Sequence, residues 1–458
     1  MTRGADTQLR KEKCSDRKET APRTQNNATN AWNYSSSANN NNKSNSNYVL
    51  PVFAYHYVTK APCMSTKVMK IEHEYVTLED VYAAYYDCRK HKSSTHGYIE
   101  YSLNYISNNY QLYAELNSGA YRIGKSKAFC VTRPKLREVF CAAFRDRIVH
   151  HLLALKFGEL LDAELTDKAY ACRKGKGTDY GIDDVRAQIE RLTDGYKREA
   201  WILKCDLQGF FMSIDRRLLF GLLERTIRGK YKGENIEWWL NLWRMVVMHD
   251  PAENCIKVGD LTLWDKLPAN KSLFPCGEGR GLPIGNLPSQ LLANLLLADF
   301  DKMMIERLGD NGGYGRYVDD FVAIHTDRKA LHVTLQWARE YLRTRLGLTL
   351  HPRKVSLQRA SSGVRFTGVM IRPYRTLPSS RTTEHLFSVI DEFGECAKPS
   401  AEDLARYANR INSLLGLIAN RASYNIRRRA WYLMPHKEMV YCVNMKKIKI
   451  KNKYKLKK

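Results

Sequence analysis

The sequence lacks long uncharged apolar runs, and this absence bears on where the protein works. No stretch approaches the ~18–20 consecutive apolar residues that a membrane-spanning helix needs. The basic N-terminus (MTRGADTQLRKEKCSDRKET) has no apolar segment behind it, so it does not match a secretory signal. The 11 cysteines occur singly, without a CxxC pair, which indicates reduced thiols rather than a disulfide framework or a zinc site. We therefore expect a cytoplasmic protein without a membrane partner.

Acidic residues are scarce relative to basic ones. The chain has 74 Lys and Arg against 48 Asp and Glu, which gives a formal net charge of +26 over 458 residues. An excess of this size favours a polyanionic partner, because each phosphate that a cation neutralises releases counterions. A solubilising surface and an anionic membrane are the alternatives, although no basic amphipathic helix supports the second.

The two ends of the chain differ in composition from its middle. Residues 1–47 are rich in Asn and Ser (NNATNAWNYSSSANNNNKSNSN), so they have too little apolar surface to fold, and we expect a disordered tail. Residues 442–458 form a basic tail, whose eight lysines either bind phosphate or are simply solvated. The region between the tails has the apolar periodicity of a folded protein.

Several predicted elements of this folded region bear on function. The stretch AWILKCD predicts a strand at Trp201–Asp206, and Asp215 is placed to cap the helix RRLLFGLLERTI. LPSQLLANLLLADFDKMMIERL predicts one long apolar helix, and a hairpin over residues 314–325 follows it. From about residue 377 the pattern is mainly helical.

Two adjacent acids interrupt that hairpin, in YVDDFVAIH. If the strand that ends at Asp206 neighbours the hairpin, then Asp206, Asp319 and Asp320 face one point. Two unit charges ~4 Å apart repel by roughly 4 kcal/mol at an effective dielectric near 20, so bare carboxylates would be costly there. Mg²⁺ takes oxygen ligands of this kind, and two such ions serve in-line phosphoryl transfer. Asp is also common in turns, so the acidic pair alone does not decide the matter.

A series of motifs surrounds these acids in a fixed order. KCDLQGFFMSID, GLPIGNLPSQ, YVDDFV and LGLTLHPRKVSL resemble the successive palm motifs of reverse transcriptases, and RPKLREVF resembles the finger motif that precedes them. The segment from Ile284 to Gln290 is similar to the reverse transcriptases of diversity-generating retroelements, found in bacteria and their phages. These have an apolar residue before the glycine and Gln after the serine. YACRKGKGT, KSLF and INSLLGLIANRASYNIRRR resemble the same family, and the resemblance covers roughly residues 70–435.

The resemblance implies an α+β fold, that of a right-hand polymerase with fingers, a palm of antiparallel sheet plus helices, and a helical thumb. It assigns residues 48–200 to an N-terminal extension and the fingers, with part of the palm. Residues 201–376 would form the palm, with a finger insertion around 230–280, and residues 377–441 the thumb. The implied activity is RNA-directed DNA polymerisation.

The resemblance also implies roles for the acidic residues. The catalytic carboxylates would be Asp206, Asp319 and Asp320. Together with the backbone oxygen of Leu207 they would hold two Mg²⁺ ions, for which Mn²⁺ is a possible substitute. We assign Asp215 and Asp301, which are close in sequence to these motifs, to capping and surface positions instead.

Further residues are implied around the incoming nucleotide and the template. The dNTP site would contain Lys135, Arg137, Phe211, Ile284, Gly285 and Gln290, and Lys354 matches a lysine proposed to protonate departing pyrophosphate. Phe211 would be the steric gate that excludes a 2′-hydroxyl, with a core aromatic as the alternative. A basic loop with Arg173, Lys174 and Lys176 suits the template backbone, although Gly-rich basic loops are common. For Lys135 and Arg137, ordinary surface charge is the alternative.

Ile284 stands where most reverse transcriptases have Gln. Loss of one polar constraint worth about 1–3 kcal/mol would relax discrimination in the base-pair pocket by about tenfold or more, unless Ile284 only packs against the fingers. The retroelement family copies template adenines with errors, and the mutated cDNA replaces a repeat in a target gene (mutagenic retrohoming). Its partners would be template RNA, primer and cDNA, dNTPs and a small basic accessory variability protein.

Two rival interpretations remain open. One is a group II intron or other bacterial reverse transcriptase, against which the form of LPIGNLPSQ speaks. The other is a catalytically idle RNA-binding protein on the same fold, against which the intact Asp206, Asp319, Asp320 and Phe211 speak.

Overall fold

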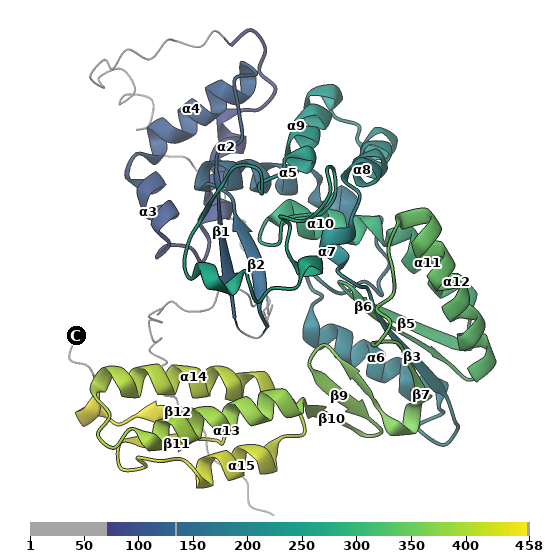
Figure 1. Cartoon of the computed structure of the whole chain (residues 1–458), viewed down its shortest axis with the longest axis vertical. Coiled ribbons are helices and arrows are strands. Elements are labelled where there is room, and N and C mark those ends of the chain that lie inside the picture. The colour runs from purple at the N-terminus through teal and green to yellow at the C-terminus, as the bar shows by residue number, and fades with distance from the viewer. Residues whose placement is uncertain (1–70, 133–134, 456–458) are drawn as a thin grey trace, which may run out of the picture. The chain divides into compact units, whose positions relative to one another are not determined.

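The computed structural model describes residues 71–132 and 135–455, coloured along the chain in Figure 1. The tail predicted at residues 1–47 lies outside the described residues. Within the described ranges, no helix is long and apolar enough to cross a membrane.

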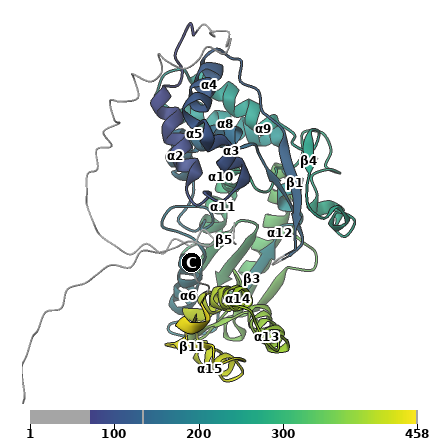
Figure 2. The same cartoon turned by 90° about the vertical axis from the view of Figure 1, so that its left-hand side faces the viewer.

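The first part of the described chain contains four helices (Figure 2): α2 (Leu78–Arg89), α3 (His96–Leu103), α4 (Tyr105–Asn117) and α5 (Phe144–Asp162). A capping box begins α2, because the side chains of Thr77 and Asp80 each accept a hydrogen bond from the other's backbone N–H. The rings of Tyr101 and Phe144, with centroids 5.2 Å apart, pack α3 against the start of α5.

A three-stranded sheet with the order β2-β1-β4 follows: β1 (Ser126–Val131), β2 (Arg137–Cys141) and β4 (Cys255–Lys257). Its central strand pairs antiparallel with β2 and parallel with β4. The buried Glu138 carboxylate of β2 accepts hydrogen bonds from Trp264 Nε1 at 2.7 Å and Leu273 N at 2.7 Å. These bonds tie the segment after β4, with its short helices η2 (Leu261–Leu263) and η3 (Ala269–Lys271), to β2.

Six further helices follow α5 along the chain and precede residue 312: α6 (Thr178–Leu192), α7 (Phe210–Ser213), α8 (Arg216–Lys230), α9 (Ile236–Met248), α10 (Leu287–Leu296) and α11 (Ala298–Leu308). Asp215 caps α8 as predicted, and its Oδ1 accepts from the N–H groups of Arg217 and Leu218. The single helix predicted over residues 287–308 is wrong. The chain turns at Leu297, whose N–H bonds to Asn294 O at 3.2 Å, so α10 and α11 are separate.

The central sheet is antiparallel and has the order β5-β6-β3-β7: β3 (Trp201–Asp206), β5 (Gly312–Tyr317), β6 (Asp320–His325) and β7 (Ser356–Arg359). The strand predicted at Trp201–Asp206 and the predicted hairpin are confirmed. Strand β3 pairs with β6 so that Trp201 faces His325 and Asp206 faces Asp320. The sheet therefore joins two segments that lie more than a hundred residues apart in the sequence.

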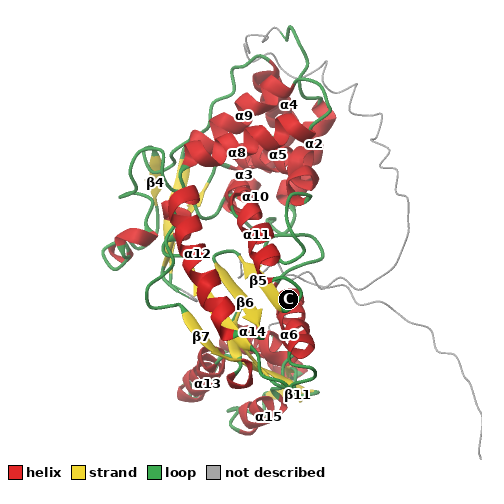
Figure 3. Cartoon of the chain, turned by 90° about the vertical axis from the view of Figure 1, so that its right-hand side faces the viewer, coloured by secondary structure: helices red, strands yellow, loops and turns green. Residues whose placement is uncertain are grey.

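Helices cover both faces of this sheet. Phe321 and Ala323 of β6 belong to the core shared with α11 and α12 (Arg328–Leu346), whereas Val322 and Ile324 pack with α6. This alternation follows from the two-residue period of a strand. Figure 3 shows the long α12 beside the strands that it contacts, β3 and β6. Because both faces of the sheet are packed against helices, the strands fix the positions of the turns at the end of the sheet.

The last part of the chain begins with a small antiparallel sheet, β8 (Val364–Phe366), β9 (Val369–Arg372) and β10 (Arg375–Pro378), after the short helix η4 (Ala360–Ser362). Three helices follow: α13 (Ser380–Glu395), α14 (Ala401–Ala419) and α15 (Tyr424–Tyr432). They have their own core, in which Leu386, Phe393 and Ile411 are at most 1% exposed.

The prediction of a basic tail from residue 442 is wrong for the described part of that stretch. Residues 440–450 form an antiparallel hairpin, β11 (Val440–Val443) and β12 (Lys447–Ile450), which packs on α14 and is followed by η5 (Asn452–Tyr454). Val440 and Ile448 are buried, and this alternation of apolar and basic residues is what makes a strand here rather than a solvated end. The fold is α+β with an antiparallel central sheet, which we call the palm sheet because the resemblance to reverse transcriptases implies a palm here.

Candidate active site

Asp319 lies in the two-residue turn between β5 and β6, and Asp320 is the first residue of β6. Val318, at φ +60°, is in the left-handed region, where a β-branched residue is rare and strained. The turn is held at that point, because Arg316 Nη1 donates to Val318 O at 2.9 Å. The backbone strain at Val318 is thus offset by a hydrogen bond from inside the protein.

Arg316 is itself held by a buried ion pair with Asp301 of α11. Arg316 Nε lies 2.7 Å from Asp301 Oδ1 and Nη2 lies 2.7 Å from Oδ2, while the Tyr314 hydroxyl donates to Oδ1 at 2.7 Å. Asp301 is fully buried and Arg316 is 1% exposed. The assignment of Asp301 to a capping or surface position is therefore wrong. Its carboxylate is the buried partner that fixes the guanidinium behind the acidic turn.

The structure brings the three predicted carboxylates together. Asp206 and Asp320 are directly opposite residues of β3 and β6, where paired Cβ atoms lie about 4.5–5.5 Å apart. Asp319 joins them, since the N–H of Leu207 donates to the Asp319 backbone oxygen at 3.0 Å. Acids from two distant motifs thus converge at the end of one sheet.

Two lysines flank these acids. Lys354 Nζ lies 2.6 Å from Asp206 Oδ2, and Lys204 Nζ lies 3.0 Å from Asp320 Oδ2. Lys204 is absent from the sequence predictions, although the two-residue strand period places it on the same face as Asp206. That alternation is the signal that would have found it.

Burial and mutual repulsion act on the protonation of the acids. Burial, and next the charge of Asp206, raise the pKa of Asp319 above its ordinary value. Burial raises the pKa of Asp320 to about 6, although the neighbouring Lys204 ammonium opposes the shift. The fold therefore holds negative charge here at a free-energy cost, which a bound cation would offset.

The donor set suits a divalent cation. Carboxylate oxygens are the ligands that Mg²⁺ prefers, and Asp320 Oδ1 is buried without a hydrogen-bond partner among the described residues. In the same described ranges, however, no group of three or more His, Cys, Asp or Glu side chains is arranged so that it could hold a metal ion. Asp206, Asp319 and Asp320 thus offer donors of the right chemical kind, but their side chains are not arranged as a metal-binding cluster in this structure.

The glycine loop GLPIGN, residues 281–286, packs against β2. Phe140 N donates to Ile284 O at 2.8 Å, and Gly285 follows at φ +122°. A Cβ at Gly285 would lie 2.3 Å from Phe140 O and 2.9 Å from Val139 Cγ1, so no side chain fits there. Gly285 thus serves the contact between loop and strand. Gln290 lies half-buried in α10.

Phe211 and Ile284 meet at one small apolar cluster. Both are half-buried and pack on the core formed by Ala128, Phe140, Met212 and Leu273. Phe210, by contrast, is 3% exposed and belongs to the main core, with its ring 5.4 Å from that of Phe211. Of the two adjacent aromatics, the accessible one is Phe211, as a gate over a nucleotide sugar requires.

Cations gather beside the carboxylates. Partial desolvation lowers the pKa of Lys135, and the positive charges of Lys354, Arg381 and Arg137 lower it further. Lys135 and Arg137 were predicted here, but Arg381, in the first turn of α13, was not. Nothing in its local sequence distinguishes Arg381 from other surface arginines, because the approach of α13 to this site is a tertiary feature.

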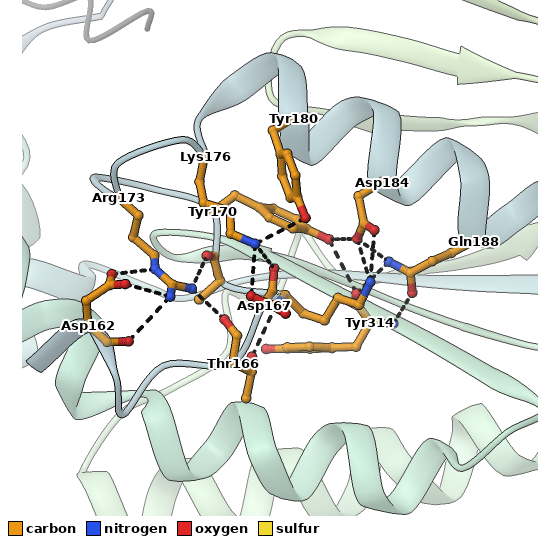
Figure 4. A network of polar contacts seen from close by, with 12 residues as sticks. Asp162, Thr166, Asp167, Tyr170, Arg173, Lys176, Tyr180, Asp184, Gln188 and Tyr314 are labelled. Atoms are coloured by element: carbon orange, nitrogen blue, oxygen red, sulfur yellow. Dashed lines mark hydrogen bonds and ion pairs between the residues drawn. The ribbon is translucent and has the colours of Figure 1, made fainter. Parts of the chain in front are cut away.

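The three cations of the basic loop that was predicted to follow the template differ in their surroundings. Arg173 bonds to both carboxylate oxygens of Asp162 and to the backbone oxygens of Thr166 and Ala169 (Figure 4). Its donors are committed to the fold, and the prediction that Arg173 binds nucleic acid is wrong. Lys176 pairs with Asp167 and lies over the Tyr180 ring. Lys174 is solvent-exposed and stays a candidate for the template backbone.

The same region secures the edge of the palm sheet, as Figure 4 also shows. Gln188 of α6 donates to Tyr314 O at 2.9 Å and accepts from Tyr314 N at 2.8 Å. These two bonds satisfy backbone groups of β5, the edge strand, that would otherwise be open to another chain. Asp184 binds the same Gln188 amide and the Tyr170 hydroxyl.

Comparison with known proteins assigns this geometry. The family described as "Reverse transcriptase (RNA-dependent DNA polymerase)" matches residues 123–371, more than half of the chain. The chain belongs to the reverse transcriptase family. The matched segment contains the three carboxylates, the glycine loop and strands β1 and β2.

Relatives of this reverse transcriptase are distant. Protein YkfC of Escherichia coli K12 is 25% identical over 288 residues, which cover 56% of this chain and 68% of YkfC. Among solved structures, apo telomerase from Candida tropicalis has a TM-score of 0.44 at 10% identity over 68% of this chain and 56% of its own. Telomerase from Candida albicans, solved with a fragment of telomeric RNA, has a TM-score of 0.41 at 11% identity, covering 68% of this chain. The match spans three fifths or less of these telomerase chains.

Proposed function

We propose that this reverse transcriptase is an active RNA-directed DNA polymerase that uses Mg²⁺. The observation that supports this most is the convergence of Asp206, Asp319 and Asp320 at the end of the palm sheet, beside the five cations Lys204, Lys354, Lys135, Arg137 and Arg381. Neighbouring carboxylates repel each other, so their proximity costs free energy in the free protein. This cost is explained if the carboxylates bind metal cations that also bind the phosphates of the substrate.

Each residue then has a defined task. Asp206 and Asp319 hold the ions, with the backbone oxygen of Leu207 and the second acid, Asp320, in support. When bound, the ions stabilise the attacking and leaving oxygens of an in-line phosphoryl transfer. Lys354, 2.6 Å from Asp206, is placed to give a proton to departing pyrophosphate.

The substrate-binding residues act by charge and shape. Lys135 and Arg137 hold the triphosphate through charge-assisted hydrogen bonds. Phe211 lies under the sugar and clashes with a 2′-hydroxyl, so the enzyme takes deoxynucleotides. Lys174 lies along the template backbone, and Gly285 and Gln290 shape the pocket around the nascent base pair.

Primer extension on an RNA template tests the activity. The wild-type chain should incorporate dNTPs in a Mg²⁺-dependent manner, Mn²⁺ should substitute, and Asp319→Ala should abolish extension. A folded wild-type protein that binds RNA but extends no primer would leave the idle RNA-binding protein as the better interpretation. Ribonucleotides offered in the same assay should be rejected, and rejection should weaken in Phe211→Ala.

We further propose that the enzyme serves a bacterial or phage diversity-generating retroelement. In that setting it copies a template-repeat RNA with errors at adenines, and the cDNA replaces a repeat in a target gene through mutagenic retrohoming. A small basic accessory variability protein would bind the enzyme. The motif IGNLPSQ supports this choice over another bacterial reverse transcriptase, and so does the apolar Ile284, which packs on the same small core cluster as Phe211.

Sequencing of the cDNA tests the retroelement proposal. Ile284→Gln should lower adenine misincorporation by about tenfold, because a polar contact in the pocket restores discrimination. Unchanged adenine errors would remove Ile284 as the cause. A near-duplicate repeat pair beside the coding region, differing mainly at adenines, should also be present, and its absence would favour an ordinary bacterial reverse transcriptase.

A further inference from the structure

The C-terminal hairpin β11–β12 lies outside the segment that matches the reverse transcriptase family, and the activity proposed above gives it no task. Asn444 and Met445 at its tip both have positive φ, as in the type I′ turns that suit the twist of a two-stranded ribbon. Lys446 N donates to Val443 O at 3.0 Å and closes the turn. The hairpin is thus a defined structural element.

Its inner face is anchored to the helices of the thumb. Asn412 of α14 forms two hydrogen bonds with the backbone of Ile448, from Nδ2 to O at 2.9 Å and from N to Oδ1 at 2.7 Å. Arg427 of α15 donates to Met445 O at 2.9 Å. The side chains of Val440 and Ile448 are buried beneath the hairpin. One face of the hairpin is therefore fixed, and the other is held toward solvent.

The outer face is basic and has one accessible aromatic ring. The register pairs Tyr441 with Lys449 and Val443 with Lys447, so these four side chains share the exposed face. Tyr441 is 42% exposed, and Lys446, Lys447 and Lys449 are exposed as well. Lysines two apart on a strand lie about 6.6–6.8 Å from each other, so the ribbon presents a regular row of positive charge.

The lysines of this face have no acidic counterpart. The sequence from Met439 to Lys458 contains no Asp or Glu. Within the described ranges, the ion pairs of the thumb involve Arg406, Arg410, Arg421 and His436, whereas Lys446, Lys447 and Lys449 have none. Lys447 and Lys449 lie close together on β12 without an acid between them, so this face is suited to an anion.

We propose that the outer face of β11–β12 binds single-stranded RNA, namely the part of the template that is not yet copied; this inference rests on the proposed function. The lysines bind the phosphate backbone, and an unstacked base stacks on Tyr441. Single-stranded RNA is the occupant because the cDNA leaves the site paired with its template, and a base in a duplex has no face open to Tyr441.

Binding of a labelled single-stranded RNA to the full chain, measured without dNTPs over a salt series, tests this surface. The variant K446Q/K447Q/K449Q should bind more weakly than wild type, and the slope of log K against log salt should fall by about 2, at about 0.7 per lysine. The matched control K232Q/K329Q/K398Q removes three exposed lysines from other elements and should keep the wild-type slope. An unchanged slope in the hairpin variant, or an equal change in both variants, would overturn the proposal.

Two further measurements sharpen the test. Tyr441→Ala should weaken single-stranded RNA binding by about tenfold without changing the salt slope, because stacking releases no counterions. Neither K446Q/K447Q/K449Q nor Tyr441→Ala should change the affinity for an RNA–DNA duplex. A loss of duplex affinity in these variants would show that the hairpin binds the duplex, and it would refute the proposal that the hairpin binds single-stranded RNA. Extension of a short primer–template by the control variant K232Q/K329Q/K398Q should stay within about twofold of wild type. A wild-type chain that extends no primer would refute the proposed function, whereas the binding measurement needs no catalysis.

Discussion

The palm hairpin β5–β6 and the C-terminal hairpin β11–β12 are both antiparallel hairpins that carry charge, and the charged side chains have opposite surroundings in the two. At the palm hairpin, acids converge while Lys204, Lys354 and Arg316 bind the acids or the turn from within the protein. At the C-terminal hairpin, the lysines face solvent without an acidic partner within the described residues. The charges of the palm hairpin are paired within the protein, whereas the lysines of the C-terminal hairpin are available to bind a partner.

This difference separates two kinds of site. Buried charge costs several kcal/mol unless it is paired. In the palm, Arg316 and Asp301 form such a buried ion pair, and this pair holds the Arg316 side chain where it bonds to the acidic turn. Exposed lysines cost little to keep and gain most when they meet phosphates. Changes at the palm hairpin should therefore alter catalysis or stability strongly, and changes on the outer face of β11–β12 should alter binding alone.

The largest effect is expected from Asp319→Asn. Loss of a metal ligand removes several kcal/mol of transition-state stabilisation, so primer extension should fall by about 10³-fold or more, at ~1.4 kcal/mol per tenfold. Stability should not fall with it. The raised pKa of Asp319 means that its charged form is disfavoured in the folded state at neutral pH, so the neutral amide should keep or raise Tm.

Thermal unfolding with added Mg²⁺ complements that measurement. Wild type should gain Tm with Mg²⁺ by mass action, and Asp319→Asn should gain less. An equal gain in both proteins would show that the ion stabilises the fold from some other place.

The second effect is on stability. Asp301→Ala leaves the Arg316 guanidinium buried and unpaired, and should destabilise the protein by about 3–5 kcal/mol in denaturant unfolding. Glu340→Ala removes a pair of similar length, Arg343–Glu340 at 2.9 Å, but on the surface of α12, and should change stability little. If the two variants were equally stable, the buried pair could not be the support of the acidic turn.

A smaller loss is expected from Asn412→Ala. The substitution removes two hydrogen bonds to Ile448 and leaves those backbone groups poorly satisfied, so we expect about 1–2 kcal/mol of destabilisation by chemical denaturation. RNA affinity should fall together with stability, because the hairpin loses its anchor. Wild-type RNA affinity in this variant would show that the docked position of β11–β12 is irrelevant to binding.

The smallest effect on stability is expected from K447E/K449E. Both side chains are exposed, so the free energy of unfolding should change by no more than about 0.5 kcal/mol. Single-stranded RNA affinity should nevertheless fall further than in the neutral glutamine variant, since the row of charge is reversed. A marked loss of Tm would mean that these lysines serve the fold after all, and the contrast between the two hairpins would disappear.

Local sequence was sufficient for some features and not for others. Asp215 caps its helix and Trp201–Asp206 is a strand because both depend on neighbours along the chain. Lys204 was within reach of the same reasoning, through its two-residue offset from Asp206. Arg173 and Asp301 were misassigned because their partners, Asp162 and Arg316, come from other elements, and a composition that looks basic or acidic does not reveal whether a charge is already paired.

The order of motifs in the sequence determined the family, the strand and turn that bear the acids, and the basic excess that favours nucleic acid. Tertiary structure decided which charges are available. It buried Asp301 against Arg316, committed Arg173 to the fold, brought Arg381 of α13 toward the palm, and turned a lysine-rich end into a ribbon with one open face. The physical reason is that local propensity depends on residues close in sequence, whereas burial and charge pairing depend on residues that only the packed chain brings together.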